Sequence, residues 1–259
     1  MFTHQAKLAS YVFPIAAILA VGVLGVLSAP AGASFIGDEM GALVDVTVTS
    51  GGDTEELAWF FPEGLLVSGR YTWSLPEAAE VHGKAQGKHL GTITQITLQL
   101  DGDPGVSLGF VVTAGASDTT FDIVSSVVPF TSIHNPLAYA SAAVTVTDNT
   151  GDGAYATGLF DANKAYEARY NSTPVVWAHL IDPVSVGVND SVTASARKPA
   201  SGRMTIFDDV SSIQSEFHFI LSANDQASGT SRFDVIVPEP ATMSLLALGA
   251  MVLIRRRRG

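Results

Sequence analysis

The sequence of 259 residues contains no cysteine. It therefore has no disulfide to stabilise its fold and no thiol to which an N-terminal lipid could be attached. A folded region must be held by its hydrophobic core, alone or together with metal ions. Acidic residues are absent from both ends, since the first is Asp38 and the last is Glu239.

Basic residues are scarce between these ends. Residues 34–237 contain 24 acidic and nine basic side chains, a net charge of −15 within a total of −11. Nucleic-acid binding needs clustered lysine and arginine to displace counterions from phosphates. The composition therefore predicts no nucleic-acid partner.

The same 200 or so residues are long and apolar enough to bury a core, with 47% hydrophobic residues over the chain. Apolar and polar residues alternate in segments such as 43–49 and 96–100, as in half-buried strands. Turn residues separate such segments every 8–12 residues or so. We predict one all-β domain, an antiparallel β-sandwich or jelly roll over residues 34–236.

Three local features of this domain can be predicted. The phase of Ile93 differs from that of Ile96, which suggests a β-bulge near Gln95. Residues 216–222 and 231–237 are expected to form a hairpin. Residues 76–80, Pro-Glu-Ala-Ala-Glu, favour one short helix because proline and acidic residues suit a first turn.

The N-terminus has the pattern of an export signal. A weakly basic start is followed by an uncharged apolar stretch at residues 11–27, and small residues Ala31 and Ala33 precede Ser34. We predict a signal peptide over residues 1–33, cleaved between Ala33 and Ser34 by signal peptidase after export through the Sec machinery. An uncleaved membrane anchor is the alternative.

The C-terminus contains a second apolar segment, residues 241–254, which would form a helix about 21 Å long against roughly 30 Å of membrane hydrocarbon. Such a helix is a poor permanent anchor. Cationic residues following it hold the tail on the cytoplasmic side during export. They are Arg255, Arg256, Arg257 and Arg258.

Pro238, Glu239 and Pro240 precede this helix. Tripeptide, short helix and arginine cluster together resemble the PEP-CTERM sorting signal of bacterial exported proteins, here over residues 237–259. The resemblance implies processing near Pro-Glu-Pro by an exosortase-type membrane protease, transient anchoring in the inner membrane, and a Gram-negative source that makes exopolysaccharide. A plain tail anchor is the alternative. Two prolines favour an extended backbone, the shape that a protease cleft binds.

A loop at residues 148–153 resembles the beginning of an EF-hand loop. Asp148, Asn149 and Asp152 could offer oxygen ligands to calcium. Thr150 stands where that pattern has a further ligand, and Leu159 stands where it has glutamate. The same residue types form ordinary hairpin turns, so both interpretations remain open.

Tyr71 and Trp73 are two residues apart and would share one strand face, with Tyr139 beside them if its strand is adjacent. Such a pair could stack on sugar rings of a glycan. It could equally belong to the core, because aromatic pairs bury large areas.

The sequence contains no His-Glu-x-x-His motif, and its Gly-x-Ser-x-Gly string at residues 105–109 lies in a segment predicted to be a strand, with no helix expected after it, unlike the strand–turn–helix setting of a nucleophile elbow. We therefore predict a non-enzymatic structural or interaction protein of the cell surface, the outer-membrane exterior or the extracellular exopolysaccharide matrix. A carbohydrate-binding or calcium-dependent adhesive module is one alternative. A secreted hydrolase, which would need paired carboxylates with perturbed pKa values in a cleft, is another.

Overall fold

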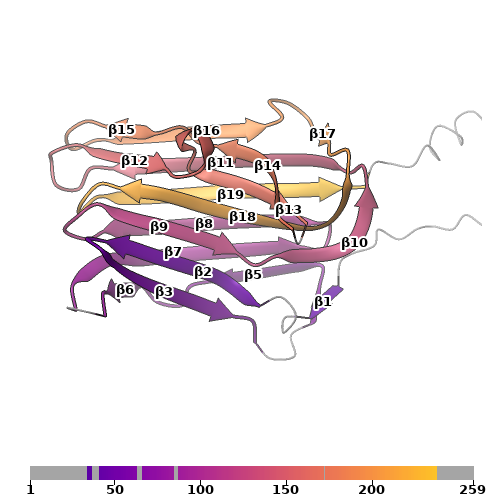
Figure 1. Cartoon of the computed structure of the whole chain (residues 1–259), viewed down its shortest axis with the longest axis horizontal. Coiled ribbons are helices and arrows are strands. Elements are labelled where there is room, and N and C mark those ends of the chain that lie inside the picture. Colours follow the sequence, from indigo (N-terminus) through magenta and orange to yellow (C-terminus); the bar gives the residue numbers. More distant parts are fainter. Residues whose placement is uncertain (1–33, 37–40, 63–65, 85–86, 172, 238–259) are drawn as a thin grey trace, which may run out of the picture.

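The computed structural model describes residues 34–36, 41–62, 66–84, 87–171 and 173–237. Within them, two large antiparallel sheets lie face to face (Figure 1). Sheet I contains nine strands: β2 (Ala42–Ser50), β3 (Asp53–Phe60), β9 (Thr119–Ser125), β10 (Val128–His134), β12 (Ala154–Gly158), β13 (Tyr166–Tyr170), β14 (Val175–Leu180), β15 (Val184–Val186) and β18 (Asp209–Leu221).

Sheet II contains eight strands: β5 (Arg70–Ser74), β6 (Ala79–His82), β7 (His89–Asp101), β8 (Gly105–Ala114), β11 (Leu137–Thr147), β16 (Ser191–Lys198), β17 (Met204–Thr205) and β19 (Gln226–Ile236). A separate small sheet pairs β1 (Ser34–Ile36) with β4 (Leu66–Ser68). A short 3-10 helix, Asp161–Asn163, follows β12.

The order of the main strands decides which side chains become neighbours. It is β14-β13-β18-β9-β2-β3 in sheet I and β16-β11-β19-β8-β7-β5 in sheet II. Successive side chains of a strand point to opposite faces, so each sheet has one face towards the core and one outer face. In β11, for example, buried and half-buried residues alternate along the whole strand.

Aromatic side chains fill the middle of the core. The ring of Phe110 in sheet II contacts Phe217 and Phe219 in sheet I at centroid distances of 4.9 and 5.4 Å. Tyr166 is fully buried beside Phe217, and its hydroxyl lies 2.9 Å from Ser215 Oγ. The core thus joins both sheets in one unit.

The predicted all-β architecture with two antiparallel sheets is confirmed. A register shift between Ile93 and Gln95 in the β7–β8 pair confirms the predicted bulge. The predicted helix at residues 76–80 is wrong, because the chain bends there and then enters β6. Proline in a bend fits this geometry as well as proline in a first helical turn.

The predicted hairpin of residues 216–222 and 231–237 is also wrong. β18 pairs within sheet I, whereas β19 pairs with β8 and β11 in sheet II. Each strand does bury one alternating set of side chains, including Phe219 and Phe233, although Val237 is exposed. An inward-facing pattern is the same in either sheet, so it does not tell which sheet a strand joins.

Both predicted sorting segments lie outside the described residues, apart from Ser34 at the start of β1 and Val237. This applies to the signal peptide with Ala31 and Ala33, and to Pro238, Glu239, Pro240 and the four terminal arginines. The described part of the chain contains no helix long and apolar enough to cross a membrane.

Candidate functional site

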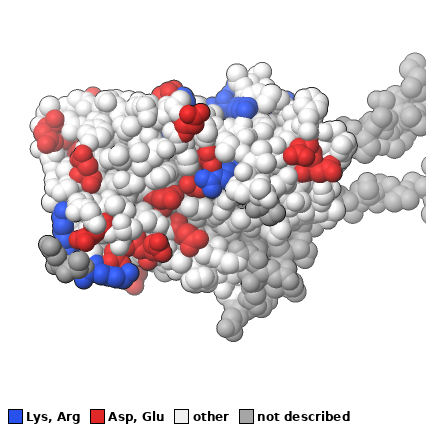
Figure 2. Space-filling model, in the orientation of Figure 1, with Lys and Arg blue, Asp and Glu red and all other residues white. Residues whose placement is uncertain are grey.

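Charged side chains cluster on the outer face of sheet I. Glu167 on β13 and Glu216 on β18 are opposite each other and nearly buried, at 4% and 6% exposure. Arg169 bonds Glu167 and places Nη2 2.7 Å from Glu216 Oε2, while His179 on β14 also bonds Glu167. In Figure 2, acidic side chains form a band across this face with basic atoms beside it.

Asp122 on β9 extends this cluster next to Glu216. One oxygen each from Asp122 and Glu216 and a ring nitrogen of His218 lie within 4.8 Å of one another. Burial, followed by the charge of Asp122, raises the pKa of Glu216 to about 8, and burial likewise raises the pKa of Asp122. Asp122 Oδ1 is buried without a hydrogen-bond partner. Two close carboxylates, one buried and one half-buried, favour holding a proton between them at neutral pH.

Phe160 covers part of this cluster. Its ring stacks on His179 at 5.8 Å, meets His218 edge-on at 5.7 Å and lies 5.9 Å from the guanidinium of Arg169. The cluster could share a proton or offer three ligand atoms to a cation. Arg169, however, already neutralises Glu216, which makes a cation less favourable there.

The loop predicted as a possible calcium site is built around Asp148. Asp148 and Asp152 lie next to Asp225, which is in the connection between β18 and β19. One carboxylate oxygen from each of the three residues lies within 4.8 Å of the other two. Asn149 instead directs its amide to the Asn224 carbonyl. Asp148 accepts backbone N–H bonds from Thr150, Gly151, Gly153 and Asn189.

These N–H groups decide what Asp148 can do. Burial alone would raise the pKa of its carboxyl, but the four backbone donors outweigh burial and hold the pKa well below its usual range. Donor hydrogens occupy the oxygens that a calcium ion would need. The donor set therefore fits a turn better than a calcium site.

Asp148→Asn is expected to lower the midpoint of thermal unfolding by several degrees at pH 7, because an amide cannot accept bonds at both of its terminal atoms. A depressed pKa stabilises the fold above the unfolded-state value near 4, and this stabilisation is lost as the pH falls below that value. Calorimetry from pH 7 to pH 3 should therefore show the difference shrinking. Asp152→Asn, in the exposed part of the same loop, should change little; equal effects of both would contradict the assignment.

The outer face of sheet II is hollowed. Two adjoining hollows of about 610 and 200 Å³ share Ala143 and Thr230. The strand registers place one row of small side chains along them, side by side across five strands: Ser195, Ala143, Thr230, Gly109 and Thr97. We call this row the trough; four strand spacings make it about 19 Å long.

Gly109 keeps the floor of the trough low. A Cβ atom at this position would lie 2.6 Å from Thr97 Oγ1, so a larger residue would displace its neighbour. The adjoining row of side chains on the same face includes Arg197, Ser141 and Arg232, which form one wall. The face therefore combines a low hydroxyl-lined floor with a charged side.

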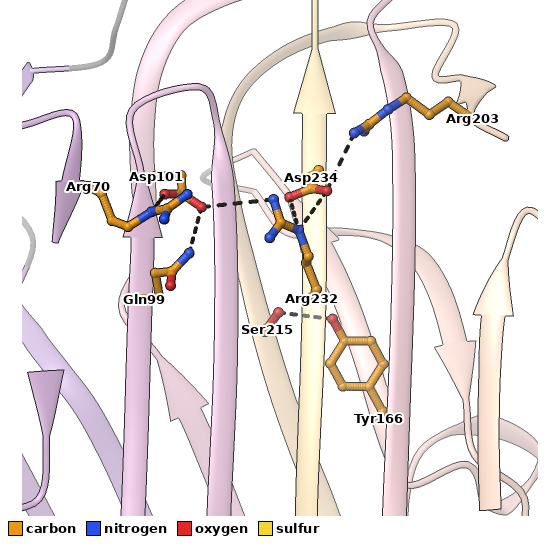
Figure 3. Close-up of polar contacts among 8 residues, drawn as sticks. All are labelled: Arg70, Gln99, Asp101, Tyr166, Arg203, Ser215, Arg232 and Asp234. Carbon is orange, nitrogen blue, oxygen red and sulfur yellow. Dashed lines mark hydrogen bonds and ion pairs between the residues drawn. The ribbon is translucent and has the colours of Figure 1, made fainter. Parts of the chain in front are cut away.

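A ladder of ion pairs continues from this wall (Figure 3). Arg70 Nε lies 2.6 Å from Asp101 Oδ1, and Arg232 Nε lies 2.8 Å from both oxygens of Asp234. Arg203 Nη2 approaches Asp234 Oδ2 at 3.5 Å, and Arg232 Nη2 approaches Asp101 Oδ2 at 3.9 Å. Both aspartates are buried, whereas the side chains of Arg70 and Arg232 are 66% and 47% exposed.

Tyr71 and Trp73 do share one face of β5, but that face points between the sheets. Tyr71 packs on Phe61 at 5.6 Å and Trp73 on Trp59 at 6.0 Å, at the open edge of the core beside a hollow of about 470 Å³. Tyr139 lies elsewhere, opposite Asp234 on the outer face of sheet II. Glycan binding by Tyr71 and Trp73 stays a prediction, at an edge that their half-buried rings leave partly covered.

Neither the charged cluster of sheet I nor the trough was predicted from the sequence. Glu167 and Arg169 are two residues apart on one strand, as are Gln99 and Asp101 on another and Arg232 and Asp234 on a third, so each pair faces one way. That spacing was the available signal. It did not show which strands would be neighbours.

Comparison with known proteins identifies the C-terminal segment. The family model of the PEP-CTERM protein-sorting motif matches residues 237–258, as the sequence predicted. This motif implies an exported, surface-sorted protein that is processed by an exosortase. No curated protein matches the chain.

Solved structures similar to the chain have low TM-scores. The enzymatically active domain of bacteriophage CBA120 tailspike protein 4 is 9% identical, with 65% of this chain and 20% of that chain covered and a TM-score of 0.28. The module TmCBM61 with β-1,4-galactotriose is 8% identical, with 65% and 88% covered and a TM-score of 0.26. A family 11 carbohydrate-binding module from Clostridium thermocellum is 14% identical, with 66% and 89% covered and a TM-score of 0.21.

Proposed function

We propose that this protein, exported and sorted through its PEP-CTERM motif, binds a polysaccharide chain in the trough of sheet II at the cell surface or in the extracellular matrix. The observation that carries the proposal is the row of small side chains across five neighbouring strands. A floor of this kind leaves space for a chain laid across the sheet.

The chemistry of the trough supports a sugar ligand. Ser195, Thr230 and Thr97 carry hydroxyl groups that can both donate and accept hydrogen bonds, as sugar hydroxyls do. Arg197 and Arg232 on the wall add guanidinium donors, and Asp234 fixes that of Arg232. Tyr139 lies on the same face, beyond the wall and opposite Asp234, and can provide an aromatic surface there.

Binding is proposed in preference to hydrolysis. A glycosidase needs two carboxylates that flank the bond to be cut. Asp122 and Glu216 are close enough, but they lie on the other sheet, and Arg169 bonds Glu216. Neither carboxylate lines the trough hollows or the hollow at the core edge.

Ala143→Trp tests the proposal, because an indole in the middle of the trough would exclude a bound chain. In affinity electrophoresis through gels containing soluble polysaccharides, both neutral and acidic, we expect at least one polymer to retard the full-length protein. The variant should weaken that binding at least tenfold, about the effect of losing one or two good contacts.

Ala116→Trp is the matched control, since Ala116 is exposed in the bend between β8 and β9 and lines none of the three hollows. It should bind like the unaltered protein. The proposal is contradicted if no polysaccharide retards the protein, or if both tryptophan variants bind as tightly as the unaltered chain. Near-ultraviolet circular dichroism would verify that both variants are folded.

A further inference from the structure

The arginines of this protein are unevenly distributed. Residues 34–237 contain five arginines, of which only Arg169 belongs to sheet I. The other four lie at one end of the outer face of sheet II, on the trough wall or in the adjoining ladder: Arg70, Arg197, Arg203 and Arg232. Two aspartates accompany them there, so a cationic surface stands out in a domain of net charge −15.

The two buried aspartates hold these arginines in place. Asp101 and Asp234 accept their shortest bonds from the Nε atoms of Arg70 and Arg232. Each guanidinium keeps N–H donors at its Nη atoms, which a ligand can reach because both side chains are about half exposed or more. Groups fixed in this way lose less conformational freedom when they bind.

Arg197 extends the surface along the same wall of the trough, two strands away from Arg232. It lines the larger hollow, and no ion pair among the described residues includes it. Its strand, β16, is two strands from β19, so Arg197 and Arg232 are about 10 Å apart across the sheet. Two cations at this spacing can bind charges that recur along an extended polymer.

Resting on the function proposed above, we infer that the trough selects an acidic polysaccharide, whose sugar carboxylates are bound by Arg197 and Arg232. Guanidinium groups match carboxylates in shape as well as charge. Uronic acids carry such groups on the ring, and the hydroxyl-lined floor would contact the rest of the sugar. Nucleic acid is a poorer fit, because duplex DNA carries one phosphate charge per about 1.7 Å and needs closely clustered cations, whereas Arg197 and Arg232 are about 10 Å apart.

The test measures binding of the full-length protein to polygalacturonate and to its fully methyl-esterified form, which differs by the loss of charge. We expect at least tenfold tighter binding to the acidic polymer and a loss of this preference as salt is added. Arg197→Gln should weaken polygalacturonate binding about tenfold, the cost of one charge-assisted contact, and leave binding of the ester nearly unchanged.

Lys84→Gln is the control, because it removes the same charge from an exposed side chain between β6 and β7 that lines neither hollow of the trough. It should leave both affinities unchanged. Equal binding of the two polymers, or preference for the ester, would overturn the acidic selectivity while leaving polysaccharide binding in the trough intact. Binding of neither polymer would overturn the acidic selectivity, and the panel used with Ala143→Trp shows whether the trough binds other polysaccharides. Duplex DNA bound as tightly, with the same dependence on Arg197, would overturn the choice of a polysaccharide.

Discussion

Glu216→Gln is expected to make the protein more stable at pH 8, by roughly 2 kcal/mol, and to leave its stability at pH 5 nearly unchanged. Glu216 is nearly buried, faces Asp122 on β9 and Glu167 on β13, and has Arg169 as its cationic partner. Burial, followed by Asp122, raises its pKa to about 8. Glutamine keeps the size of the side chain and never ionises.

The direction in which stability changes with pH follows from the protons that the folded and unfolded protein bind. Between pH 4.5 and 8 or so, the folded protein holds a proton on the Asp122–Glu216 pair that the unfolded chain has released, so stability falls as the pH rises. One such group changes stability by at most about 1.4 kcal/mol per pH unit, and Arg169 and solvent reduce the effect. Urea unfolding from pH 5 to pH 8 should show a flatter curve for the variant.

Glu80→Gln is the matched control, since Glu80 is a largely exposed side chain on β6. Its curve should run parallel to that of the unaltered protein. Parallel curves for Glu216→Gln as well would show that the proton is not held at this pair.

Phe217→Ala is expected to destabilise the protein by about 3–5 kcal/mol, the usual cost of deleting a buried aromatic ring. Phe217 is fully buried and contacts Phe110 across the sandwich and Tyr166 on the neighbouring strand. The cavity would remove the contact that Phe217 makes with Phe110 between the two sheets. Urea unfolding monitored by tryptophan fluorescence would measure the loss.

Phe207→Ala provides the contrast, because Phe207 is 88% exposed. It should change the free energy of unfolding by no more than about 0.5 kcal/mol. Similar losses in the two variants would mean that Phe217 is not at the centre of the core. The comparison uses the same chemical change and therefore isolates burial.

Much of the candidate site depends on strand order, which the sequence does not contain. Alternation along β19 shows that Thr230 and Arg232 face away from Phe233. It does not show that Ala143 and Gly109 are their neighbours, since these residues are distant in the chain and meet only by register. The wrong hairpin has the same origin. Asp225 likewise joins Asp148 only because the two loops meet at one end of the sandwich.

The sequence by itself determined the destination of the protein and its class of fold. The sorting motif and the alternating strands are patterns of residues that are contiguous in the sequence, so they can be recognised without knowing the tertiary structure. Only the tertiary structure decided that Tyr71 and Trp73 turn towards the core edge, that carboxylates crowd sheet I, and that small residues and arginines form a trough on sheet II. The reason is that cross-strand neighbours are set by the pairing of whole sheets, through backbone hydrogen bonds that any residue except proline can make.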